Sequence, residues 1–133
     1  MKKLLWLDDV RDPLESDWLK LSPIEKPFEA VWVKSYEEFI RWITANGLPD
    51  GICFDYNLGK KKEVELRAKG VSKKVARRIK AQEKTGMDCA KWLIKYCTDN
   101  KLCLPKYSIQ GSSDYGRENI NILLKNFDRH HAL

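Results

Sequence analysis

Three aspartates stand directly after apolar runs, a placement that suits metal or phosphate chemistry. Asp8 and Asp9 follow residues 4–7, which read Leu-Leu-Trp-Leu, and Asp55 follows residues 52–54, which read Ile-Cys-Phe. Short apolar runs of this kind are typical of strands buried on both faces of a parallel sheet. In open α/β sheets the ligand crevice lies at the carboxyl ends of the strands. We therefore expect Asp8, Asp9 and Asp55 to converge at one crevice.

Converging carboxylates repel one another unless a cation or a shared proton compensates their charge. Clusters of oxygen ligands suit Mg²⁺, and Mn²⁺ accepts similar ligands. The sequence therefore predicts a Mg²⁺ or Mn²⁺ site at Asp8, Asp9 and Asp55. A plainer alternative stays open, in which Asp8 and Asp9 only cap the loop after the first strand.

The elements that must position these aspartates alternate between strand and helix along the chain. Strands are predicted over residues 4–7, near 30–33, over 52–55 and over 106–110. Helices are predicted after Ser35, after Thr85 or Asp88, and around the apolar positions of residues 120–127. This alternation predicts a doubly wound α/β domain, with a parallel sheet of at least four strands. Residues 1–133 are short enough to form a single domain.

A strongly basic segment follows the strand that ends at Asp55. Residues 59–84 hold eleven Lys or Arg and three Glu, a net charge of +8, whereas the rest of the chain has a net charge of −2. We expect a helix from about Ser72 to Lys84, with Val71, Val75 and Ile79 on its apolar side. The first half of the segment carries no such pattern.

The basic helix suggests a polyanionic partner, with three readings left open. Its exposed cations could contact RNA or another nucleic acid, and the candidate contacts are Lys73, Lys74, Arg77 and Arg78. The same charges could dock an acidic protein, or simply form a solvated surface. A narrow apolar stripe without an aromatic anchor argues against a membrane surface.

Other features of the sequence argue against a membrane-spanning or secreted protein. No stretch approaches the ~20 apolar residues that a membrane span needs, and the amino terminus does not resemble a signal peptide. The four cysteines lack paired Cys-x-x-Cys spacing, which favours free thiols in a reducing compartment. We expect a cytoplasmic protein, whose oligomeric state the sequence leaves open.

Four motifs follow one another along the chain. They are Leu-Trp-Leu-Asp-Asp-Val-Arg-Asp-Pro at 5–13, Asp-Tyr-Asn-Leu-Gly at 55–59, Thr-Gly-Met-Asp at 85–88 and Gln-Gly-Ser-Ser-Asp-Tyr-Gly-Arg-Glu-Asn at 110–119. In this order they resemble the motifs of the cyclic-phosphate processing receiver-like family of small bacterial and phage proteins, whose members read like Leu-Trp-Leu-Asp-Asp-x-Arg-x-Pro, Asp-His-Asp-Leu-Gly, Thr-Gly-x-Asp and His-Ser-x-Asn-Pro-x-Gly-Arg. The resemblance implies a receiver-like, flavodoxin-like fold, with residues 59–84 as a basic helical insertion.

The site itself departs from the family pattern. Tyr56 and Gln110 stand where the resemblance places histidines, and Asn57 stands where it places a further aspartate. Histidine is the side chain best suited to proton transfer near neutral pH, so these replacements put imidazole-based catalysis in doubt. The two histidines of the chain, His130 and His131, are expected in an exposed carboxyl-terminal tail.

Several residues are candidates for contact with a phosphate. Arg11 lies in the motif after the first strand, although it could equally serve a rigid turn and an ion pair. Ser112 and Ser113 precede the last predicted helix, where free backbone amides could bind an anion or be capped in the ordinary way. Arg117 falls in the first turn of that helix, where a cation opposes the helix dipole, which favours a ligand-binding role.

Three functions are consistent with these residues. The leading one is metal-assisted binding or processing of a phosphate ester, a nucleotide or a nucleic-acid end of the cyclic-phosphate type, with Asp55 as the catalytic carboxylate. The alternative is a catalytically degenerate module that binds nucleic acid or a host protein through the basic insertion. A phosphoacceptor receiver is the third, weakened because no strand ending in a lysine follows the fourth.

Overall fold

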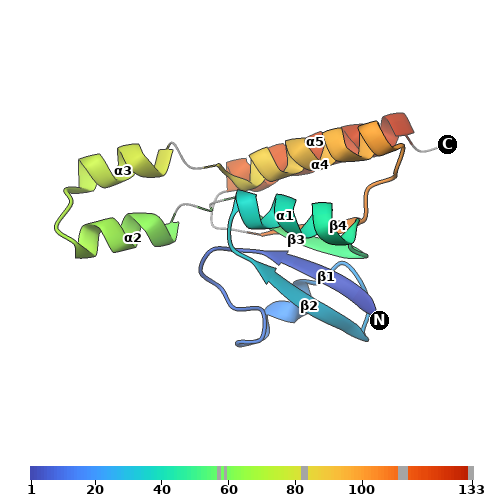
Figure 1. The fold of residues 1–133 in the computed structure, drawn as a ribbon, viewed down its shortest axis with the longest axis horizontal. Coiled ribbons are helices and arrows are strands. Elements are labelled where there is room, and N and C mark those ends of the chain that lie inside the picture. Colours follow the sequence, from blue (N-terminus) through green and yellow to red (C-terminus); the bar gives the residue numbers. More distant parts are fainter. Residues whose placement is uncertain (57, 59, 82–83, 111–113, 132–133) are drawn as a thin grey trace.

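The computed structural model describes residues 1–56, 58, 60–81, 84–110 and 114–131. Four parallel strands form its sheet in the order β2-β1-β3-β4, as Figure 1 shows. The strands are β1 (Lys2–Leu7), β2 (Phe28–Val33), β3 (Gly51–Asp55) and β4 (Lys106–Gln110). This confirms the predicted four-stranded parallel sheet. Strands β1 and β2 each begin two residues earlier than expected, and β3 begins one residue earlier. The order matches the first four strands of a flavodoxin-like sheet, whose switch point lies between β1 and β3.

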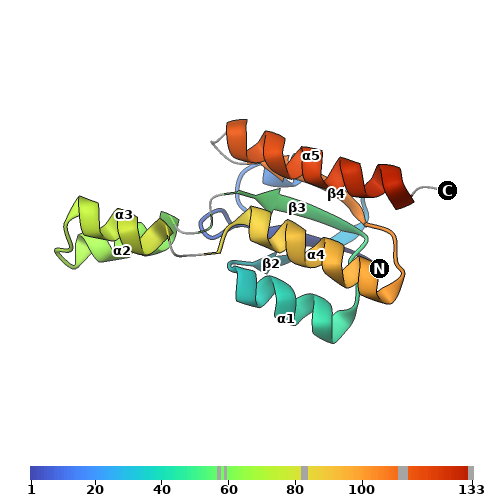
Figure 2. The ribbon, with the colours of Figure 1, turned by 90° about the horizontal axis from the view of Figure 1, so that it is seen from above.

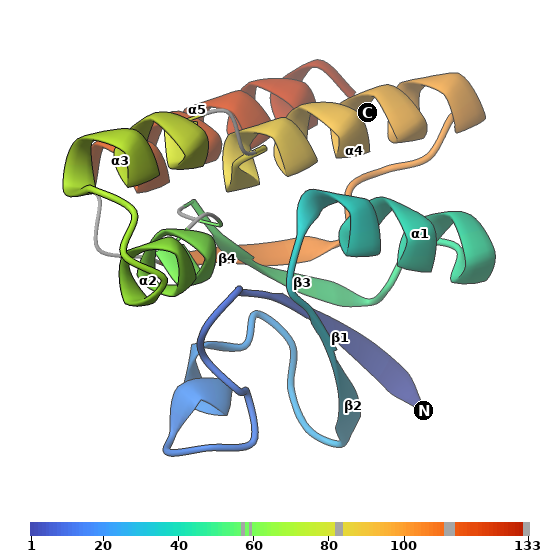
Figure 3. The ribbon, with the colours of Figure 1, turned by 60° about the vertical axis from the view of Figure 1, so that its left-hand side comes forward.

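The two faces of the sheet are covered differently. Helices α1 (Tyr36–Asn46), α4 (Gly86–Asn100) and α5 (Asp114–His131) pack into one apolar core with β1 and β3. The opposite face holds a smaller core under the β1–β2 connection, which contains the 3-10 helix η1 (Trp18–Leu21). Figure 3 shows the long helices above the sheet and η1 below it. The receiver-like α/β fold is therefore confirmed, with one thinly covered face.

Local signals in the sequence explain where α1 and α4 begin. The Ser35 side chain accepts a hydrogen bond from the Glu38 amide at 3.1 Å, as its capping position predicts. Thr85 and Asp88 form a complete capping box, which identifies Thr85 as the cap of α4 and Asp88 as its third residue. Gly47 ends α1 with a φ of 84°, a left-handed conformation that glycine adopts without strain.

The basic segment forms two helices rather than one. Helices α2 (Lys60–Ala68) and α3 (Lys73–Ala81) are joined through Gly70, whose φ is 89°, and pack against each other as a hairpin. Figures 1 and 2 show that this hairpin projects away from the sheet and from the three long helices. The helical character of the insertion was predicted, but α2 was not recognised as a separate helix, because its residues lack an apolar period and favour helix by propensity alone.

The apolar side of α3 also differs from the prediction. Val75 is 44% exposed, whereas its neighbour Ala76 is fully buried. The buried side of α3, the helix that packs on α2, therefore includes Ala76 rather than Val75. An ion pair between Lys80 Nζ and Glu63 Oε2, 3.3 Å apart, also joins α3 to α2.

The last helix is present as predicted, but it continues through His130 and His131, which were expected in a tail. Helix α5 extends as far as His131, and its residues Ile120, Leu124 and Phe127 lie in the main core. His130 is exposed near the last turn of α5, far along the chain from the aspartates. No helix among the described residues is long and apolar enough to cross a membrane.

Candidate metal centre

The three aspartates converge where neighbouring strands end. Asp8 and Asp9 follow β1, and Asp55 ends β3, the strand beside β1. One carboxylate oxygen from each residue lies within 4.8 Å of the other two. All three are buried, with exposed fractions of 1%, 5% and 5% for Asp8, Asp9 and Asp55. The convergence of carboxylates expected from the sequence is therefore present at the switch point of the sheet, and this group of three residues is called the acidic crevice below.

The Asp8 carboxylate organises the loop that follows β1. Its Oδ1 atom accepts hydrogen bonds from the amides of Val10 and Arg11, both at 2.9 Å. Its Oδ2 atom lies 3.4 Å from Gln110 Nε2 and 3.7 Å from Arg11 NH1. Asp8 thus caps the loop as the plainer alternative expected, and it also faces the other two carboxylates. One carboxylate can serve both roles because it has two oxygens.

Three tryptophans hold the same loop. The Trp6 indole N–H donates to the Arg11 carbonyl at 3.0 Å, and the Trp32 indole N–H donates to the Asp8 carbonyl at 2.7 Å. The Arg11 guanidinium lies 5.0 Å from the ring centre of Trp18. The sequence shows these tryptophans as scattered apolar residues, and only the folded chain reveals that they position the acidic loop.

Helix α4 and helix α5 approach the end of β3 through glycines. A Cβ atom on Gly86 would lie 2.1 Å from the Asp55 carbonyl oxygen, so only glycine permits this contact of α4 with β3. The Gly86 amide donates to the Tyr56 carbonyl at 3.0 Å. A Cβ atom on Gly116 would lie 2.3 Å from Tyr56 Cγ, so the first turn of α5 packs directly on the Tyr56 ring. Both glycines belong to the motifs noted in the sequence.

Gln110 is the fourth polar residue buried beside the aspartates. It pairs in register with Asp55 across β3 and β4, and only 7% of its surface is exposed. Its Nε2 group contacts Asp8, but its Oε1 atom has no hydrogen-bond partner in the part of the chain that the structure describes. The motif placed Gln110 at the site, but an unpaired buried acceptor cannot be inferred from sequence.

The other candidate phosphate contacts lie in different places. Arg11 reaches the rim of the acidic crevice, with one third of its side chain exposed. Arg117 lines a hollow of about 410 Å³ between β4 and α5, whose other lining residues do not include the three aspartates. Ser112 and Ser113 lie outside the described residues. A role in phosphate binding stays a prediction for all four residues.

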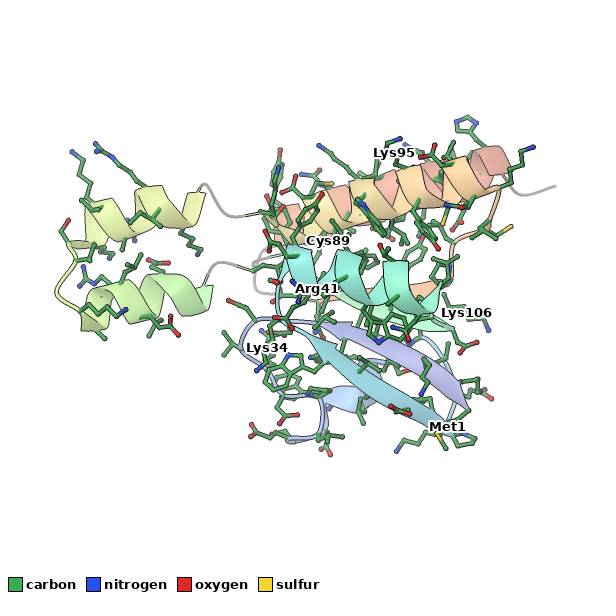
Figure 4. All side chains as sticks on the ribbon, viewed as in Figure 1. Met1, Lys34, Arg41, Cys89, Lys95 and Lys106 are labelled. Atoms are coloured by element: carbon green, nitrogen blue, oxygen red, sulfur yellow. The ribbon has the colours of Figure 1, made fainter. Side chains whose placement is uncertain are left out.

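The predicted nucleic-acid contacts gather on the hairpin. Lys73, Lys74, Arg77 and Arg78 together line a hollow of about 500 Å³ on α3. All four side chains are exposed, and none forms an ion pair with any described residue. Figure 4 shows nitrogen-tipped side chains on the hairpin, away from the sheet. The hairpin therefore presents concentrated positive charge to solvent.

One protein-family model matches the part of the chain that contains both the sheet and the four motifs. A model of the cyclic-phosphate processing receiver domain matches residues 3–126. The chain belongs to this family. The match spans the four strands, the three aspartates and the hairpin of this receiver domain, so the resemblance seen in the motifs is confirmed. No curated protein and no solved structure matches the chain.

Proposed function

We propose that this receiver domain binds and processes a phosphate ester at Asp8, Asp9 and Asp55, with a divalent cation held by the three carboxylates. The observation that carries the proposal is the approach of one oxygen from each residue to within 4.8 Å of the others, with all three residues buried. Three buried negative charges at this spacing repel one another, and a bound cation offsets that repulsion. Hard oxygen ligands favour Mg²⁺ or Mn²⁺.

The family points to the class of substrate. Its description names cyclic phosphates, so the substrate proposed here is a nucleotide or nucleic-acid end with a phosphate ester of that type. A bound cation would polarise a phosphoryl oxygen and stabilise the charge that develops during hydrolysis. Arg11, at the rim of the crevice, is placed to contact the remaining phosphate oxygens. Asp55 is the proposed catalytic carboxylate.

The absence of an imidazole from the motif positions shapes the proposed chemistry. Tyr56 and Gln110 occupy the positions where the family pattern has histidines, the side chain best suited to proton transfer near neutral pH. Gln110 cannot exchange a proton at neutral pH. Proton transfer by these two residues is therefore unfavourable, and we expect activity to depend strongly on the cation.

The direct test uses RNA that ends in a 2′,3′-cyclic phosphate, incubated with and without Mn²⁺. We expect the wild type to open or remove the cyclic phosphate only with metal, and Asp55→Asn to lose this activity. Asp17→Asn is a matched control, because Asp17 is exposed and makes no capping hydrogen bond. A folded wild-type protein that shows no turnover with any divalent metal would reject catalysis.

A second candidate function is supported by the hairpin. Four cations that form no ion pair with the residues described by the structure line one hollow on α3, whereas Lys80 on the same helix is paired with Glu63. Unneutralised charge on a projecting element favours binding of a polyanion such as RNA. In this reading the receiver domain is a binding module, with or without catalysis at the crevice. An acidic protein partner is the competing occupant.

The phosphoacceptor reading lacks comparable support. The described sheet ends at β4, so it supplies no fifth strand from which a lysine could reach a phosphate on Asp55. Gln110 ends β4 instead, and it contacts Asp8.

A further inference from the structure

The side-chain oxygen of Gln110 is a buried acceptor to which no described residue donates a hydrogen bond. Gln110 is 7% exposed, and its Oε1 atom has no hydrogen-bond partner among the described residues. A buried polar group left unsatisfied is destabilising, because it has lost its hydrogen bonds to water without gaining others. Such a group in a native fold calls for an explanation, and a bound ion is one of the usual ones.

The contact of Gln110 Nε2 with Asp8 fixes the orientation of the Gln110 side-chain amide. Nε2 lies 3.4 Å from Asp8 Oδ2, a contact in which the amide nitrogen donates and the carboxylate accepts. The flipped amide would place two acceptors against each other, which is unfavourable. Because Oε1 and Nε2 share one carbon atom, the unpaired oxygen lies within the width of one amide group from the Asp8 contact. It is therefore held beside the acidic crevice.

The strand register explains why this oxygen belongs to the crevice. Gln110 is paired with Asp55 across β3 and β4, and Asp8 and Asp9 follow β1 on the other side of β3. Three adjacent strands thus bring four oxygen-bearing side chains to one end of the sheet. Three of them carry negative charge, and the fourth has an unused neutral acceptor.

We propose that Gln110 Oε1 is a direct ligand of the divalent cation, completing an oxygen-only set with Asp8, Asp9 and Asp55. The proposal rests on the cation site of the proposed function and deepens it. Amide oxygens are ordinary ligands for hard cations. Mg²⁺ takes about six oxygen ligands, so four protein oxygens leave room for substrate or water oxygens.

The ligand set has a consequence for metal selectivity. A set without nitrogen or sulfur favours Mg²⁺ and Mn²⁺, whereas an imidazole ligand favours Zn²⁺ and other transition metals. Glutamine at position 110, where the family pattern has histidine, should therefore make this receiver domain selective for hard cations. Replacing Gln110 with histidine should move the preference toward Zn²⁺.

The experiment measures cation binding directly, without any catalytic readout. Mg²⁺, Mn²⁺ and Zn²⁺ are titrated calorimetrically into wild type, Gln110→Ala, Gln110→His and Asp55→Asn, and the melting temperature of each is recorded with and without metal. Loss of a group that only orients a metal ligand already costs ~10–100-fold in affinity. We therefore expect Gln110→Ala to lose at least about tenfold in Mg²⁺ affinity, and Gln110→His to raise the ratio of Zn²⁺ to Mg²⁺ affinity.

Control variants separate the possible failures. Tyr107→Phe alters the same strand within the helix-covered core and should keep the wild-type Mg²⁺ affinity. Gln110→Glu retains an oxygen ligand and should bind Mg²⁺ at least as tightly as wild type, even if Gln110→Ala does not fold. Binding by wild type with equal affinity in Gln110→Ala would overturn the Gln110 proposal alone. Absence of binding by folded wild type would overturn the cation site itself.

Discussion

The backbone of Gly116, in the first turn of α5, lies directly against the ring of Tyr56, the residue that follows Asp55. A Cβ atom at Gly116 would come within 2.3 Å of Tyr56 Cγ and 2.7 Å of Cδ2, closer than carbon atoms can approach. The contact joins the start of α5 to the end of β3, beside the acidic crevice. Glycine is required here because of space, and no positive φ is involved.

Replacing Gly116 with alanine should destabilise the protein. Alanine favours helix over glycine by up to ~1 kcal/mol, but overpacking of a tight contact typically costs ~1–3 kcal/mol. We expect Gly116→Ala to lower the free energy of unfolding in wild type, and to raise it in the background of Tyr56→Ala. Urea denaturation of the two single variants and the double variant measures this reversal of sign. An equal effect in both backgrounds would contradict the Tyr56 contact.

Thiol reactivity should be confined to one cysteine. Cys53, Cys89 and Cys97 are buried, and Cys103 is exposed. Burial raises the pKa of Cys53 and of Cys97 to about 11 and raises the pKa of Cys89 further, so their reactive thiolate forms are scarce at pH 8. Iodoacetamide at pH 8 should add one group to the native chain and four in denaturant, as counted by intact mass.

Cys103→Ser provides the control for thiol reactivity. This variant should remain unlabelled in its native state at pH 8, and it should add three groups in denaturant. Rapid labelling of Cys53 would show that the η1 connection opens readily, because Cys53 belongs to the small core beneath it.

The hairpin should carry any affinity for single-stranded nucleic acid. Each phosphate contact contributes a slope of roughly −0.7 to the dependence of log affinity on log salt, so four contacts give about −3. Replacing Lys73, Lys74, Arg77 and Arg78 with glutamine should flatten this slope. The melting temperature should change little, since the four side chains are exposed and unpaired among the described residues. Fluorescence anisotropy with labelled RNA at several salt concentrations measures the slope.

A charge-matched control distinguishes the hairpin from net charge. Arg41, Lys91, Lys106 and Arg129 are exposed on the body of the protein, and their replacement by glutamine removes the same four charges. Figure 4 shows Arg41 and Lys106 away from the hairpin. This control should retain most of the slope. Loss of affinity in both variants alike would indicate nonspecific attraction, and no binding at low salt would leave an acidic protein as the remaining partner.

Excising the hairpin should leave a folded receiver domain. The ends of α2 and α3 that join the body lie on its same side, and the two helices pack against each other. A chain in which a short Gly-Ser linker replaces residues 60–81 should therefore keep a cooperative thermal transition and its response to Mg²⁺. It should lose nucleic-acid binding. An unfolded product would show that the hairpin supports the sheet.

The acidic crevice could be predicted from the sequence because strand ends are encoded locally. An apolar run that stops at an aspartate specifies both the strand and the edge where the carboxylate lies, so Asp8, Asp9 and Asp55 could be brought together without coordinates. Capping residues identified the starts of α1 and α4 for the same reason. The family match agrees with the motif order.

The features that escaped prediction depend on contacts between distant residues. Helix α2 has no apolar period, and it is recognised only from its packing on α3. The buried side of α3, the helix that packs on α2, includes Ala76 rather than Val75. Gln110 Nε2 donates to Asp8, 102 residues away along the chain, and this contact leaves Oε1 without a partner among the described residues.

The tryptophans that contact the loop after β1 should report ligand binding through their fluorescence. Trp6 and Trp32 donate hydrogen bonds to the backbone of this loop, and Trp18 lies beneath the Arg11 guanidinium. Three of the five indoles in the chain thus contact the segment that a cation or phosphate would rearrange. Ligand entry should shift the intrinsic emission spectrum, while Trp42 and Trp92, packed against the main core, supply a steady background. Occupancy of the crevice could then be followed in real time without a label.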